Sequence, residues 1–223
     1  MTLSALALTT IPQIRTALNL TTTQADDPTV EGLIDAVSAL MENYTGRVLA
    51  SRTFTDEPQD GNGRNNLYLR GDSKPAYPVT ALTALTLLTL NLQQPYPINV
   101  TPSGNQVRVE PATGRLTLYF GAFPILLSGG YDGGLAFPLG RNNILASFTA
   151  GFSLTTHPAQ RRLLERLAIT GVQWLLADVA RESGATQVRV GDTSVTYAGG
   201  TAAAVLPSVI QTGLQSFICR QLA

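Results

Sequence analysis

The chain has 223 residues and a mass of 23.7 kDa, which suits one large domain or two small ones. Fifteen Lys and Arg residues balance fifteen Asp and Glu residues, and only 13% of residues are charged, against roughly 25% in an average globular domain. This composition excludes a basic nucleic-acid binder, which needs a surplus of cations, and a disordered acidic chain. A sparsely charged surface favours coverage by partner subunits.

Helices are predicted at the beginning of the chain. A short one is expected over residues 12–19, with the proline in its first turn. The next is the clearest prediction, because Asp26 and Pro28 form a helix-start signal and Gly46 is a typical terminator. Between them, apolar residues recur every three or four positions over 30–44, which indicates one buried face.

The pattern changes from residue 47 to residue 153. Thr and Gly become frequent, turn signals recur at 60–63 and 70–72, and apolar residues alternate with polar ones in short segments. This spacing predicts a small antiparallel sandwich or barrel. The Gly- and Pro-rich segment 121–141 is expected to form a long loop. The expected strands cover residues 52–55, 66–70, 79–91, 106–110, 115–120 and 144–150.

The last third of the chain returns to helices. A long helix is predicted over 158–182, burying an apolar face that begins at Leu163. A β-hairpin follows around Gly191 and Asp192, and a proline-led helix over 207–221 ends the pattern. The sequence therefore predicts an α+β fold. A helical body of about four helices comes from residues 1–48 and 156–223, and a central antiparallel β-rich insert from residues 49–155.

The sequence offers no catalytic or metal-binding constellation. The only histidine, His157, is expected to cap a helix, and the only cysteine, Cys219, to take a core or interface position. No nucleotide-binding, zinc-protease or nucleophile-elbow motif occurs. We therefore expect no enzyme, no cofactor and no metal site. The alternative is a hydrolase whose best carboxylates are Asp132 with Asp56 or Glu57, although these have no partner at motif spacing.

One dense basic cluster stands out, formed by Arg161, Arg162 and Arg166. Two functional interpretations are open, contact with DNA or contact with an acidic neighbouring subunit. The third interpretation is a solvated helix face, with Glu165 and Asp178 nearby.

No apolar run approaches the roughly 20 residues of a membrane span. The first eight residues lack a basic region, so no signal peptide is expected.

An ordered series of short motifs runs through nearly the whole chain. It comprises Leu-Asn-Leu at 18–20, the acidic pair at 26–27, Glu-Asn-Tyr-Thr-Gly-Arg at 42–47, Tyr-Pro-Val at 77–79, Ser-Phe-Thr-Ala-Gly-Phe at 147–152, the helix-opening Pro158, and Val-Thr-Tyr at 195–197 before the proline-led last helix. The series resembles the head–tail connector proteins, also called adaptor or head-completion proteins, of tailed bacteriophages. The segment 121–141 has no match in that family.

The resemblance implies a structural role at the head–tail junction of a virion that is assembled in the host cytoplasm. Such proteins form a ring of about 12 subunits below the portal protein, extend the DNA channel and carry the neck or tail proteins. Genomic DNA passes through without sequence-specific binding, and no membrane is involved. In such a ring, contact of Arg161, Arg162 and Arg166 with DNA or with a neighbouring subunit would put them at the channel or at the subunit interface. The resemblance directs the C-terminal segment, with Leu214, Phe217, Ile218 and Arg220, to the portal.

A second class of function stays open. In it, the chain is a tail or receptor-binding virion module whose β-rich insert binds a glycan or a protein. A concave aromatic site would favour this alternative, and the residues available for it are Tyr68, Tyr77, Tyr96, Tyr119 and Tyr131.

Overall fold

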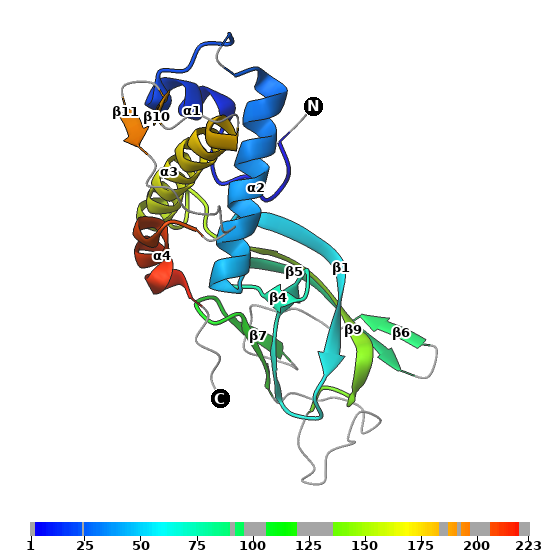
Figure 1. Cartoon of the computed structure of the whole chain (residues 1–223). Helices are drawn as coiled ribbons and strands as arrows, with labels where there is room; N and C mark the ends of the chain where they lie inside the picture. Colours follow the sequence, from blue (N-terminus) through cyan, green and yellow to red (C-terminus); the bar gives the residue numbers. More distant parts are fainter. Residues whose placement is uncertain are drawn as a thin grey trace. The chain divides into compact units, whose positions relative to one another are not determined.

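The computed structural model describes residues 3–23, 25–89, 92–95, 106–119, 136–182, 187–190, 193–196 and 206–218. The chain divides into two compact units. Met1–Ala50 and Phe152–Ala223 form the helical unit, and Ser51–Gly151 forms the β unit, which is inserted between them in the sequence. Figure 1 shows the helices and the antiparallel sheets, which confirm the predicted α+β class.

The described part of the helical unit contains four α-helices and a hairpin. The helices are α1 (Ile11–Leu18), α2 (Asp27–Thr45), α3 (Pro158–Glu182) and α4 (Ser208–Leu214), and strands β10 (Gln187–Val190) and β11 (Thr193–Thr196) pair as the predicted hairpin. The helix predicted over 207–221 is shorter than expected. After α4 the chain tightens into a 3-10 turn, Gln215–Phe217, and Ile218 is extended. Such turns commonly end helices, and this one brings Phe217 into the core.

Helices α2 and α3 form the centre of this unit. Val30, Ile34, Val37 and Met41 of α2 are fully buried in one apolar cluster with residues of α3. Gly171 of α3 permits the close approach, because a Cβ there would lie only 2.6 Å from Cγ1 of Val37. The packing of α2 against α3 therefore fixes which helix faces remain exposed.

The N-terminus of α2 is capped by Asp26. Its carboxylate accepts the backbone N–H of Thr29 at 3.0 Å. Hydrogen bonding to the side chain of Thr29, and after it to the backbone of Thr29, lowers the pKa of Asp26. Because the pKa is lower in the folded state, the stabilisation is present above the unfolded pKa of about 4 and is lost as the pH falls through the folded pKa.

We expect Asp26→Ala to lower the melting temperature of the helical unit near neutral pH, and the difference from wild type to shrink below about pH 4. Calorimetric scans across this pH range measure both effects. The control is Asp26→Ser, which keeps an uncharged cap and should differ from Asp26→Ala by an amount that does not depend on pH. A pH-independent difference between Asp26→Ala and wild type would contradict the carboxylate cap.

The β unit contains two main antiparallel sheets. In the first, the order is β1 (Arg52–Gly61), β9 (Gly140–Ala150), β5 (Val79–Thr89) and β6 (Leu92–Pro95). In the second, the order is β2 (Asn66–Tyr68), β8 (Arg115–Tyr119) and β7 (Gln106–Glu110). Separately from both, β3 (Arg70–Gly71) pairs with β4 (Lys74–Pro75). Among the described strands no barrel closes, because β1 and β6 are the edges of the first sheet.

The core of the β unit follows the expected alternation. Along β9, Ile144, Ala146 and Phe148 are fully buried, while the residues between them are half-buried. Phe148 stacks on Phe54 of β1 with ring centroids 4.9 Å apart. One face of the first sheet is therefore packed with apolar side chains.

Several predicted boundaries in the β unit are wrong. Strand β1 extends to Gly61, so the chain turns only after the first two residues of the turn predicted at 60–63. Arg70 and Gly71 form β3, so the turn predicted at 70–72 begins at Asp72. The strand predicted over 79–91 ends at Thr89, and β6 was not predicted. The loop predicted over 121–141 ends too late, because β9 begins at Gly140 and Phe137 is fully buried. Residues 120–135 lie outside the described part of the chain.

Within the helical unit, the chain leaves for the β unit and returns at neighbouring backbone positions. The N–H of Phe152 donates to the carbonyl of Leu49 at 2.8 Å, and Ala50 forms a parallel bridge with Phe152. The fully buried carboxylate of Glu42, at the end of α2, accepts the N–H groups of Leu49 at 2.9 Å and Ala50 at 3.3 Å. A buried carboxylate thus satisfies the amides of a segment that has left the helix.

Candidate interaction surface

The predicted arginine cluster is divided between two sides of α3. Arg161 is turned inward, with its side chain only 16% exposed. Its guanidinium donates to the carbonyl of Ala7 at 3.3 Å and lies 3.6 Å from a carboxylate oxygen of Glu165. Burial lowers the pKa of Arg161, and the charge of Glu165 opposes that shift. Arg161 therefore ties α3 to the N-terminal segment of its own chain.

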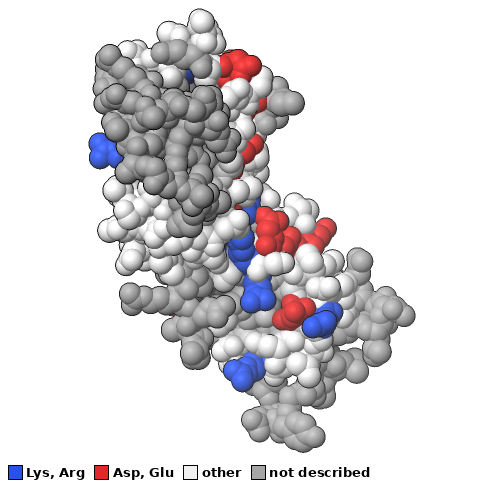
Figure 2. Space-filling view, viewed as in Figure 1, with Lys and Arg blue, Asp and Glu red and all other residues white. Residues whose placement is uncertain are grey.

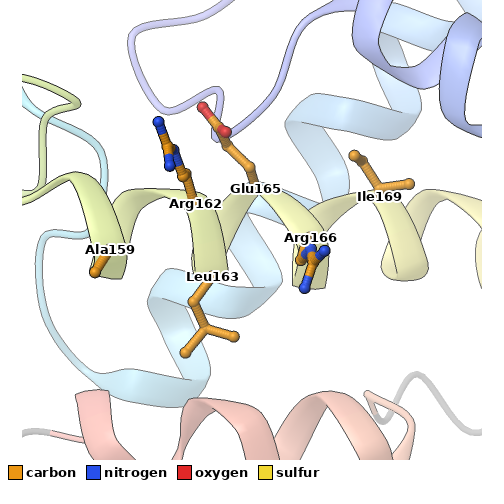
Figure 3. A pocket seen from close by; sticks show the side chains of 6 residues that line it. All are labelled: Ala159, Arg162, Leu163, Glu165, Arg166 and Ile169. Carbon is orange, nitrogen blue, oxygen red and sulfur yellow. The ribbon is translucent and has the colours of Figure 1, made fainter.

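Arg162 and Arg166 are exposed. Their side chains form no ion pair or hydrogen bond with any residue that the structure describes. They border a shallow depression of about 530 Å³ along α3 (Figure 3). In this view Leu163 points to one side of α3 and Arg162 to the other, with Arg166 between them. The described residues that line the depression are Ala159, Arg162, Leu163, Glu165, Arg166 and Ile169.

Leu163 was predicted to belong to the buried face of this helix, and that prediction is wrong. Its side chain is 40% exposed, whereas the next residue, Leu164, is fully buried. An apolar side chain of this size beside two unpaired guanidinium groups is suited to contact with another surface. We refer to Ala159, Arg162, Leu163, Arg166 and Ile169 as the α3 face.

The C-terminal residues expected at the portal lie in different environments. Leu214 is fully buried and Phe217 is 3% exposed, with the ring of Phe217 edge-on to Phe152 at 5.3 Å. Ile218 is 37% exposed, and Arg220 lies outside the described residues. Leu214 and Phe217 therefore hold the helical unit together, and in this conformation only Ile218 of the described three presents a sizeable surface.

The described residues that were considered as candidates for catalysis form hydrogen bonds within the protein. The carbonyl of His157 accepts the N–H of Arg161 at 3.0 Å, which is the first bond of α3, so His157 occupies the predicted cap position. The carboxylate of Glu57 accepts the N–H of Asp72 at 2.9 Å, and that of Asp56 accepts the hydroxyl of Ser147 at 3.2 Å. Asp132 lies outside the described residues, and among those described no three His, Cys, Asp or Glu side chains gather as metal ligands.

The tyrosines proposed for a receptor site are only partly described. Tyr68 is 46% exposed and Tyr77 is half-buried, whereas Tyr96 and Tyr131 lie outside the described residues. An aromatic binding site in the β unit stays a prediction. No helix in the described ranges is long and apolar enough to span a bilayer.

Charge is sparse over the described surface that Figure 2 shows. In the helical unit, acidic groups follow the upper part of α2, and a basic group projects at the opposite edge. Most of the remaining described surface in this view is uncharged. A surface with few charges contributes less to solubility than a highly charged one, which favours its coverage by partner proteins.

Comparison with known proteins gives a fold but no family. No protein-family model matches the chain, and no curated protein does. Among solved structures, a chain from "Neck of empty GTA particle computed with C6 symmetry" superposes with a TM-score of 0.57 at 18% identity, covering 98% of this chain and 92% of that chain. A chain from "Neck of native GTA particle computed with C12 symmetry" has a TM-score of 0.49 at 17% identity, covering 98% of this chain and 95% of that chain. The first likeness shows that the two chains share a fold over nearly their whole lengths.

Proposed function

We propose that the chain is a structural subunit of the neck of a phage-like particle, where it forms the ring that connects head to tail. The observation that carries this proposal is the fold shared with a GTA neck chain over 98% of the present chain. The motif series in the sequence supports the same role, because its members follow the order of elements in head–tail connectors. The sixfold symmetry applied to that neck is compatible with a ring of about 12 subunits, a multiple of six.

The finer parts of the proposal concern partners. The ring docks below the portal protein, extends the DNA channel and carries neck or tail proteins, after assembly in the host cytoplasm. The helical unit forms the body of the ring, and the β unit presents loops to neighbouring virion proteins. Because Leu214 and Phe217 are buried, the proposed portal contact is reduced to Ile218 and Arg220. The balanced charge of the chain suits a channel through which DNA must slide without being held.

The proposed role requires no catalysis. The candidate carboxylates that are described, Asp56 and Glu57, are engaged by a serine hydroxyl and a backbone amide. The only histidine packs edge-on against Phe152, with ring centroids 5.5 Å apart. These contacts support a structural role for each of the three side chains.

Native mass spectrometry of the full chain, alone and mixed with the portal protein of the same particle, tests the proposal. We expect a ring of about 12 copies, either for the chain alone or only in the presence of the portal. A monomer in both samples would overturn the connector assignment and favour the tail or receptor-binding module. An Ile218→Asp variant separates the two levels of the proposal, because it should still form a ring but bind the portal more weakly.

A further inference from the structure

The α3 face combines two basic side chains without ion-pair partners and an exposed apolar side chain, a combination that is typical of an interaction surface. Arg162 and Arg166 have no acidic partner among the described residues, and Leu163 is exposed on the same helix beside Arg166. The depression that these side chains border has a volume of about 530 Å³. Arginine is favoured over lysine at interfaces because its planar group forms paired hydrogen bonds with carboxylates. An acidic partner surface fits this face best.

The outward side of α2 has the complementary character. The carboxylate of Glu31 is half-exposed and has no ion pair or hydrogen bond with any described residue, and Asp35 is half-exposed one turn later. Next to them, Gly32 and Ala36 are exposed, and apart from the chain neighbours of Gly32 and the backbone of α2 itself no atom lies within 4 Å of the position that a Cβ of Gly32 would take. We refer to Glu31, Gly32, Asp35 and Ala36 as the α2 face. It is an acidic surface without large side chains.

The two faces look away from each other. Helices α2 and α3 pack together through their buried sides, where Val37 meets Gly171. Figure 3 agrees, since α2 lies behind α3 when the depression faces the reader. A subunit of a closed ring contacts its two neighbours through two different surfaces on opposite sides. The basic α3 face and the acidic α2 face have this arrangement, and neither can satisfy the other within one chain.

We propose that the α3 face of one copy docks on the α2 face of the next copy, with Arg162 and Arg166 opposite Glu31 and Asp35. This inference rests on the proposed ring. It assigns the arginines to the subunit interface rather than to the DNA channel. Leu163 packs over Gly32 and Ala36, where the lack of large side chains lets the two helices come close.

A charge-swap experiment tests the contact. Arg162→Glu with Arg166→Glu gives a variant with two acidic faces, and Glu31→Arg with Asp35→Arg gives one with two basic faces. We expect each variant alone to lose ring formation, with an apparent dissociation constant raised at least about 30-fold. An equimolar mixture should restore a ring of alternating variants, because each interface then joins opposite charges. Native mass spectrometry distinguishes the alternating ring by mass.

Two controls protect the interpretation. Arg64→Glu with Arg141→Glu reverses the same number of charges at exposed positions of the β unit, and should leave ring formation unchanged. Asp35 accepts a hydrogen bond from the hydroxyl of Ser4 at 2.7 Å, so Glu31→Arg alone serves as a second basic variant if the double variant is unstable. Thermal unfolding confirms that each variant is folded before its assembly is measured.

Each outcome has a distinct meaning. If the wild type forms a ring and the single-type variants do so equally well, the proposed contact is overturned while the ring survives. The same holds if the variants fail alone and the mixture fails too. If the arginine variant forms rings but binds DNA less strongly than wild type, these side chains line the channel instead. If the wild type forms no ring, alone or on the portal, the proposed function itself fails.

Discussion

Replacing Phe217 with Ala is expected to lower the free energy of unfolding of the helical unit by about 3–5 kcal/mol. The ring of Phe217 is 3% exposed and packs edge-on against Phe152 at 5.3 Å, so its removal leaves a cavity in the apolar cluster. The neighbouring variant Ile218→Ala is the matched control. Because Ile218 is 37% exposed, its truncation removes less buried apolar surface and should lower the unfolding free energy by only about 1 kcal/mol.

Chemical denaturation followed by tryptophan fluorescence measures both effects. Trp174 is the only tryptophan and lies in α3, so its signal reports on the helical unit. Equal denaturation midpoints for Phe217→Ala and wild type would contradict the core position of this side chain. The two variants, Phe217→Ala and Ile218→Ala, also show why portal binding is better tested with a point substitution than with a deletion. A deletion of residues 206–223 would remove Ile210, Leu214 and Phe217 from the core, and would confuse unfolding with lost docking.

A second large effect is expected at Glu42. Its carboxylate is fully buried and accepts the N–H groups of Leu49 and Ala50. Glu42→Ala leaves these buried donors without this acceptor, at about 1–3 kcal/mol each, so we expect a loss of about 3 kcal/mol or more. Glu42→Gln keeps an amide oxygen at the same place and should lose less.

Tryptophan fluorescence on denaturation again measures stability, and hydrogen exchange of the two amides tests the cause. In Glu42→Ala the amide protons of Leu49 and Ala50 should exchange much faster than in wild type, while Glu42→Gln should retain most of their protection. Unchanged protection in the Ala variant would show that the carboxylate does not hold these amides.

Local signals made some elements predictable and left others out of reach. Helix α2 could be placed because its cap Asp26, its proline and its terminator Gly46 are all adjacent to it in sequence. The length of β1 could not, because its end at Gly61 pairs with Gly140 of β9, far along the chain. Strand β3 depends in the same way on Gln59, whose amide exchanges two hydrogen bonds with the backbone of Arg70, at 2.7 and 2.9 Å. Contacts between residues that are far apart in the chain leave no pattern in the local sequence.

The candidate surface was predictable in part. The three arginines could be identified because they lie close together in the sequence. Their spacing along α3 does not show which of them contacts the N-terminal segment of the chain. In the structure it is Arg161, which donates a hydrogen bond to the carbonyl of Ala7. Helical periodicity likewise assigned Leu163 to the core, although it is 40% exposed, because an apolar pattern does not show how wide a face the neighbouring elements cover. The apolar spacing also did not show that the last helix gives way to a 3-10 turn over Gln215–Phe217.

Because Ala50 and Phe152 are bridged to each other, the β unit is attached to the helical unit as an insertion whose two ends are adjacent. We call such an exchangeable insertion a cassette. Both of its attachment points lie within one backbone ladder, and the entropy of closing a loop grows only with the logarithm of its length. Segments of very different size can therefore be carried there at similar cost to the host fold. Divergence between lineages is expected to concentrate in the cassette, while the helical unit that carries it changes slowly.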